Sequence, residues 1–162
     1  LSNSHISGSI RSGSQQQWYT RNTYMHSWVG GSWNMFYQGV SNAPNDVCEN
    51  KTTVFTSIQN TPVIAEKPYI AYESGKYYLM IPPVERNKVG PTDFSDAQIT
   101  QIDFSNVYVT NPATDTASSI NAKIAAGLHV VFSPGNYNLT QAIEVSRSNI
   151  TLLGLGFATL MP

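Results

Sequence analysis

Segments with the composition of β-strands recur along this sequence, and almost all are too short to build a core alone. In the first forty residues they are expected at 5–10, 16–22, 25–28 and 33–40, separated by small polar turns. Gly, Ser and Thr are frequent, and no apolar stripe with a period of about 3.6 residues persists, so helices are not expected here. Short strands become stable when they stack as solenoid coils, because each coil buries its inward side chains against its neighbours.

The middle of the chain predicts a connecting segment. Residues 41–60 are looplike around an Asn-Ala-Pro-Asn-Asp run, which is typical of a chain break between strands. Residues 62–72 and 76–83 are rich in Ile, Val and Tyr and flank a Glu-Ser-Gly turn, so they predict a hairpin. Residues 84–100 are expected to be irregular, and 102–110 are expected to form another strand.

The final third predicts the one convincing helix, over residues 116–127. Asp115 or Thr116 can cap its start, Ala117, Ile120 and Ile124 recur on one face, and Gly127 occupies the C-cap position. Strands are expected after it at 129–132, 137–145 and 150–155. A helix before a run of short strands suits the open end of a β-helix, whose first coil otherwise exposes unpaired backbone groups.

Composition excludes several classes of function. Only 12% of residues are charged, against about 25% in typical globular domains, and Ser, Thr, Asn and Gln supply the polarity, as on proteins outside the cell. The formal charge of −1 includes no basic block, so no nucleic-acid partner is expected. No run approaches the roughly 18 apolar residues of a membrane span. His5, His26 and His129 are scattered, so neither a metal site nor a cofactor is expected.

Several features predict a protein that is secreted or at the cell surface. Three N-glycosylation sequons begin at Asn50, Asn138 and Asn149, which fits a eukaryotic secretory route and predicts a glycoprotein. Asn50 is the best of the three sites because its segment is looplike and polar. Cys48 is the only cysteine, so no disulfide forms within these residues. The missing initial Met and the apolar stretch 152–162 indicate a piece of a longer polypeptide, whose remainder is an expected partner.

Two groups of motifs carry a resemblance to known families. The last fifty residues resemble the opening of pectate-lyase-like β-helices, through Asp115-Thr-Ala-Ser-Ser-Ile-Asn-Ala-Lys-Ile, Val130-Val-Phe-Ser-Pro-Gly-Asn-Tyr, Ile143-Glu-Val and Asn149-Ile-Thr-Leu-Leu-Gly-Leu-Gly. The earlier part resembles the middle of large secreted proteins related to family 55 glycoside hydrolases, through Ser12-Gly-Ser-Gln-Gln-Gln-Trp-Tyr-Thr-Arg-Asn, Ser32-Trp-Asn-Met-Phe, Gly39-Val-Ser-Asn-Ala-Pro and Thr61-Pro-Val-Ile-Ala-Glu-Lys-Pro-Tyr.

The resemblance implies an all-β, right-handed parallel β-helix of the pectin-lyase type, in a fragment of a protein with two such helices. Residues 1–40 then end the first β-helix, 41–112 connect, and 113–162 supply the capping helix and first coils of the second. Characterised family 55 members are inverting exo-β-1,3-glucanases, so a polysaccharide or oligosaccharide partner is implied. The alternative is a non-catalytic β-helix protein that binds glycan or builds a cell surface.

No catalytic residue is identified in the sequence. Inverting hydrolysis needs a carboxylic acid and a second group that activates water. Glu66, beside Lys67, is interpreted as part of a strand-edge ion pair. Four aspartates among turn and cap signals are expected to serve backbone N–H groups, namely Asp93, Asp96, Asp103 and Asp115.

Five residues are candidates for substrate binding. Gln15 and Gln17 share a face, because strand side chains alternate, and their amides can hold sugar hydroxyls or a water. An internal ladder or a solvated coil is the alternative for them. Trp18, Trp28 and Trp33 offer planes for the C–H faces of sugar rings; core filling or an interface between two solenoids is their alternative.

Overall fold

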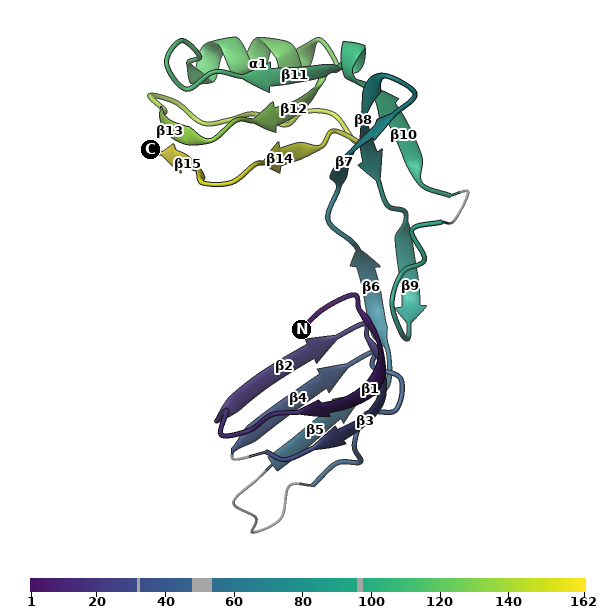
Figure 1. The fold of residues 1–162 in the computed structure, drawn as a ribbon. Coiled ribbons are helices and arrows are strands. Elements are labelled where there is room, and N and C mark those ends of the chain that lie inside the picture. The colour runs from purple at the N-terminus through teal and green to yellow at the C-terminus, as the bar shows by residue number, and fades with distance from the viewer. Residues whose placement is uncertain (32, 48–53, 96–97) are drawn as a thin grey trace. The chain divides into compact units, whose positions relative to one another are not determined.

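The computed structural model describes residues 1–31, 33–47, 54–95 and 98–162, and Figure 1 shows them as a ribbon. The chain divides into two compact units. The first unit consists of residues 1–66 with 82–98, and the second of residues 67–81 with 99–162.

The first unit is built from stacked parallel coils (Figure 1). The first four strands alternate between two walls, so that each turn of the chain adds one strand to each wall, as in a parallel β-helix, and the fifth strand joins the same wall as the fourth. One wall contains β1 (His5–Arg11) and β3 (Tyr24–Val29), and the other contains β2 (Gln17–Arg21), β4 (Asn34–Gln38) and β5 (Val54–Ile58). The four strands predicted in the first forty residues are therefore confirmed.

Inward side chains of these coils form one core. In register across β2, β4 and β5, Trp18 is opposite Met35, which is opposite Phe55. They pack with the fully buried Met25 and Tyr37. Alternation along each strand selects these residues, because a strand with one face on the core buries every second side chain.

Two residues with positive φ turn the coil corners after β2 and β4. Asn22 (φ 45°) and Gly39 (φ 59°) follow the two strands at equivalent places, and the Asn22 N–H donates to the Gln38 carbonyl at 2.9 Å. A Cβ at position 39 would lie 2.6 Å from the Lys88 carbonyl oxygen and 2.8 Å from the Thr61 hydroxyl. Only glycine fits this corner, because any other residue is both strained and obstructed there.

An antiparallel pair completes the first unit. β6 (Thr61–Ala65) pairs with β9 (Val84–Lys88), so the prediction that 84–100 is irregular was wrong for β9. The Val-Glu-Arg-Asn-Lys segment has no apolar alternation to mark it as a strand. Its conformation comes from pairing with a distant segment.

The second unit begins with a hairpin whose turn lies where it was predicted. The single strand predicted over 62–72 was wrong, because residues 61–65 form β6, which pairs with β9, and the hairpin strand begins only at Tyr69. β7 (Tyr69–Glu73) and β8 (Lys76–Ile81) are joined by Ser74 and Gly75, both with positive φ, as a two-residue hairpin turn requires. β10 (Thr100–Asp103) pairs with β8 on its other side. The single strand predicted over 102–110 was wrong, because Asp103 accepts the Ser105 N–H at 2.8 Å and starts a 3-10 turn, η1 (Phe104–Asn106).

The rest of the second unit forms the capping helix and parallel coils. One wall contains β11 (Val107–Thr110), β12 (His129–Phe132) and β14 (Leu152–Gly154), and the other contains β13 (Gly135–Asn138) and β15 (Ala158–Met161). α1 (Ala117–Ala125) is capped by Thr116 through a capping box with Ser119. The predicted parallel β-helix is confirmed, and a helix lies within the predicted range 116–127 (Figure 1).

Both faces of the β11–β12–β14 sheet are covered. Val130 and Phe132 pack inside the coil with Ile120 and Ile124 of α1. On the other face, residues of the hairpin sheet cover the strands in a second cluster around Leu79, Val107, Val131 and Leu153. This explains why all four residues of β12 are buried, since strands covered on both faces lack polar alternation.

The strand predicted over 137–145 ends at Asn138. Asn121 of α1 donates its amide N–H to the Ala142 carbonyl and accepts the Glu144 N–H, each at 2.9 Å. The prediction was wrong beyond Asn138, because a helix side chain takes the backbone groups that a neighbouring strand would need.

Candidate functional site

The glutamine candidates lie together on the surface. Gln15, Gln16 and Gln17 are exposed, and with Ser14 they line a shallow, open depression at the start of β2. The Gln15 N–H donates to the Ser12 carbonyl at 3.1 Å, which fixes the turn. This placement leaves amide groups accessible to a ligand and argues against an internal ladder.

Two of the tryptophan candidates are packed in the coil. The Trp18 and Trp28 ring centroids are 5.3 Å apart at 70°, and Trp28 meets the buried Tyr37 at 5.3 Å and 80°. Their indole N–H groups donate at 2.9 Å to the Thr20 hydroxyl and the Gly30 carbonyl. Trp18 and Trp28 are partly buried against the core, and their indole N–H groups are bound within the chain, so both fit the core-filling alternative.

Trp33 is placed differently from the other two tryptophans. It is 53% exposed and lies just before β4, where its carbonyl accepts the Val54 N–H at 2.7 Å. Its backbone is fixed by the sheet while its ring remains accessible. Among the three tryptophans, the structure leaves Trp33 as the one able to meet a ligand without repacking the core.

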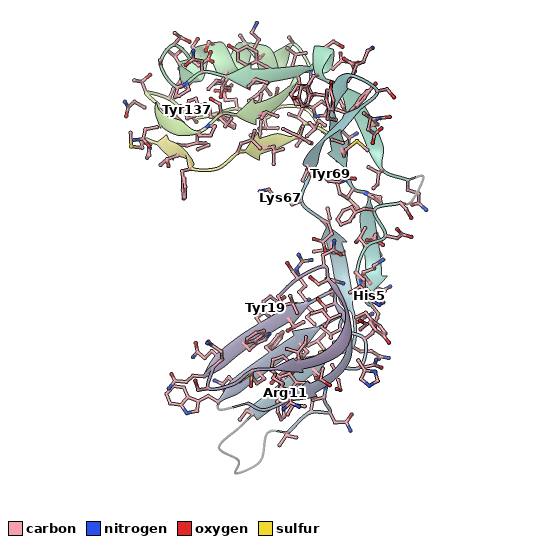
Figure 2. All side chains as sticks on the ribbon, in the orientation of Figure 1. His5, Arg11, Tyr19, Lys67, Tyr69 and Tyr137 are labelled. Atoms are coloured by element: carbon pink, nitrogen blue, oxygen red, sulfur yellow. The ribbon has the colours of Figure 1, made fainter. Side chains whose placement is uncertain are left out.

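Beside the candidate Gln17, the outward face of β2 and β4 carries residues that were not among the five candidates. We define the outer face as Gln17, Tyr19, Asn34, Phe36 and Gln38. Tyr19 is 48% exposed, its centroid lies 5.5 Å from that of Phe36, and its hydroxyl donates to Gln38 Oε1 at 2.8 Å. Figure 2 labels Tyr19. The sequence could have indicated Tyr19, because residues two positions apart in a strand point to the same face, and Gln17 was already a candidate.

An ion pair borders the outer face. The Arg21 guanidinium donates from Nη1 and Nη2 to the two oxygens of Glu66 at 2.8 and 3.0 Å. The Arg21 side chain is 22% exposed and that of Glu66 only 7%. The hydrogen bond with Glu66 raises the pKa of Arg21. Glu66 is thus in an ion pair, as interpreted from the sequence, and its partner is Arg21.

Four other carboxylates are engaged locally. Burial alone would raise the pKa of Glu85 and of Asp115. Hydrogen bonds to the two carboxylates outweigh this effect, so the pKa of each lies below its usual value. Glu85 receives them from Lys88 and Thr92, and Asp115 from Asn111, Ser119 and Tyr108. Hydrogen bonds from Ser95 and Ser105 lower the pKa of Asp93 and Asp103.

Backbone N–H groups are served by Asp93, Asp103 and Asp115, as predicted; Asp96 lies outside the described residues. A general acid needs a raised pKa, whereas the pKa values of Glu85, Asp93, Asp103 and Asp115 are lowered.

The remaining candidates do not gather into a site. Asn138 and Asn149 are exposed, and Asn50 lies outside the described residues. The described ranges contain no group of three His, Cys, Asp or Glu side chains placed to hold a metal.

His129 is buried, its Nδ1 accepts the Thr151 N–H at 3.1 Å, and burial lowers its pKa. No helix in the described part of the chain is long and apolar enough to cross a membrane.

Comparison with known proteins shows a match to the resembled family. Residues 107–162 match the LAM55 pectate lyase-like domain. The whole chain is 37% identical to an exo-beta-1,3-glucanase of Streptomyces sp. (strain SirexAA-E / ActE), and it spans 26% of that protein's length.

A solved structure, that of sacteLam55A from Streptomyces sp. SirexAA-E, is 36% identical with a TM-score of 0.89, over 98% of this chain and 29% of that chain. A variant of sacteLam55A in complex with glucose matches with the same identity and TM-score. Along its whole length the chain is therefore similar to pectate-lyase-like β-helix proteins related to family 55 glycoside hydrolases.

Proposed function

We propose that this chain is part of a secreted carbohydrate-active protein that hydrolyses β-1,3-glucan or a related wall polysaccharide. The observation that carries the proposal is the match along the entire chain to an exo-beta-1,3-glucanase, with the same fold at a TM-score of 0.89. In this proposal, residues 1–40 end one β-helix, 41–112 connect, and 113–162 open a second.

The surface chemistry of the first unit supports a glycan ligand. Gln15, Gln17 and Trp33 are accessible, and amides and an indole suit sugar hydroxyls and C–H faces. No catalytic acid is assigned among the carboxylates discussed above, because they are engaged in local hydrogen bonds, while Gln15 and Gln17 remain candidates to hold a water. The engaged carboxylates also favour one alternative, a non-catalytic glycan-binding or cell-surface β-helix protein.

One assay separates the two functions. The full-length protein is incubated with soluble β-1,3-glucan, and NMR follows the released sugar and its first-formed anomer. We expect glucose released as the α-anomer, since inversion at a β-linked carbon gives that product. Cellulose serves as the control polymer and is expected to remain intact. Binding without release establishes the non-catalytic alternative, and neither binding nor release refutes both.

A further inference from the structure

Two adjacent rings on the outer face have no role in the coil's core. Tyr19 and Phe36 are opposite one another in the parallel register of β2 and β4, with Thr56 of β5 next in the row. Their rings meet at 5.5 Å and 52°, and nearly half of Tyr19 is accessible. Neighbouring strands lie about 4.8 Å apart, so the sheet sets this ring spacing.

The rings are held before any ligand arrives. The Tyr19 hydroxyl donates to Gln38 Oε1 at 2.8 Å, and the sheet fixes both backbones through continuous pairing from β2 to β5. The same Gln38 amide still carries two N–H donors for a hydroxyl group. A surface ordered in advance loses less conformational entropy on binding, which raises affinity.

The charge of this surface fits an uncharged, hydroxyl-rich ligand. Gln17, Asn34 and Gln38 contribute amides and no charge. The neighbouring guanidinium of Arg21 is neutralised by Glu66 through two hydrogen bonds. A polyanion gains nothing here, whereas a sugar ring offers C–H groups to the aromatic faces and hydroxyls to the amides.

From this geometry, and resting on the proposed function, we propose that the outer face is a binding platform for a β-1,3-linked glucan chain. Tyr19 and Phe36 stack on the sugar, and Gln17, Asn34 and Gln38 bind its hydroxyls. The competing occupant is another segment of the same polypeptide, which would use the rings as an apolar contact. The two occupants differ in whether ring removal costs binding or stability.

The test uses the full-length protein and β-1,3-linked gluco-oligosaccharides of increasing length, with affinity measured by calorimetry. Tyr19→Ala and Phe36→Ala are expected to weaken binding by roughly 3- to 10-fold each, as loss of an aromatic contact does. Tyr19→Phe keeps the ring and is expected to stay closer to wild type. Tyr72→Ala is the matched control, because Tyr72 is also exposed, at 64%, and also contacts a second tyrosine, Tyr77, at 4.8 Å.

Thermal unfolding of each variant and glucan hydrolysis by the wild type are measured alongside. Tyr19→Leu keeps apolar volume in case Tyr19→Ala fails to fold. Ring variants that bind like wild type, or that lose affinity only in proportion to their unfolded fraction, overturn the platform. If the wild type meanwhile releases glucose, the proposed function survives that result. Ring-dependent binding without hydrolysis supports the platform and refutes the hydrolase. A wild type that binds no β-1,3-linked oligosaccharide overturns both.

Discussion

Replacing Glu66 by Gln should loosen the first unit by about 2–3 kcal/mol. The carboxylate accepts two charge-assisted hydrogen bonds from Arg21, at 2.8 and 3.0 Å, and each contributes about 1.5–3 kcal/mol. The Gln amide retains one acceptor, so roughly one such bond is lost. Removing one partner of a fully buried pair costs about 3–5 kcal/mol. We expect the smaller cost of about 2–3 kcal/mol for Glu66→Gln, because the Arg21 side chain is 22% exposed and can bind water instead.

Hydrogen exchange of backbone amides in β2 and β6 is the appropriate assay. The full-length protein contains more than one unit, so a global melting curve is not a two-state measurement, whereas exchange reports the local opening free energy. Glu73→Gln is the control, because Glu73 is exposed and its carboxylate accepts a 3.2 Å hydrogen bond from the neutral amide of Gln101. We expect that variant to change protection by less than about 0.5 kcal/mol.

A double variant tests the physical cause. Replacing both Arg21 and Glu66 by Met removes the charges together, and such replacements are often neutral or stabilising. We therefore expect the double variant to exchange more slowly than Glu66→Gln. The reasoning is refuted if Glu66→Gln leaves protection in β2 and β6 unchanged, or if the double variant opens more readily than the single one.

Three further predictions concern the second unit and the sequons. Ile124→Ala removes a fully buried side chain beneath α1 and should cost about 2–5 kcal/mol, read as faster exchange in α1 while β6 is unaffected. Burial lowers the pKa of His129 below 6.5. The contribution of the neutral imidazole to stability is therefore complete above pH 6.5 and is lost as pH falls towards the folded-state pKa. His129→Gln should flatten the pH dependence of the opening free energy, measured by hydrogen exchange between pH 8 and 5. In protein secreted by a eukaryotic cell, peptide mapping after deglycosylation should find glycan at Asn50 first, then at the exposed Asn138 or Asn149; an unmodified Asn50 beside an occupied Asn138 contradicts that order.

Local patterns were sufficient for the coils, the hairpin and the cap. The Ser74-Gly75 turn and the Thr116 cap are contained within a few residues, so the sequence predicts them directly. β9 was missed because its Val-Glu-Arg-Asn-Lys sequence has no strand signal and is ordered by pairing with β6 across the chain. The same limit applies to the loop after Asn138, where Asn121 of α1 supplies the hydrogen bonds.

Side-chain placement was harder to predict than strand placement. Gln17 and Trp18 are neighbours and were both candidates, yet adjacent strand residues point to opposite faces, and only the structure shows which face is the core. Trp18 packs inside with Trp28, while Tyr19 points outward with Gln17. Glu66 was interpreted as paired, but its partner Arg21 lies 45 positions earlier in the chain, a distance at which local patterns carry no information.

The two walls of the first unit differ in whether their strands can accept an inserted or deleted residue. Along β1 the chain advances from Ile6 to Ser9 while β3 advances only from Met25 to Ser27, so β1 contains an extra residue in a bulge. The β2–β4–β5 wall is matched one residue to one throughout, and an insertion in β4 would turn Met35 and Tyr37 to solvent and Phe36 inward. Relatives of this chain should therefore show alignment gaps in the first wall and at the turns. The wall that contains Tyr19 and Phe36 tolerates substitutions but not insertions. The spacing between these two positions should therefore be the same in all relatives.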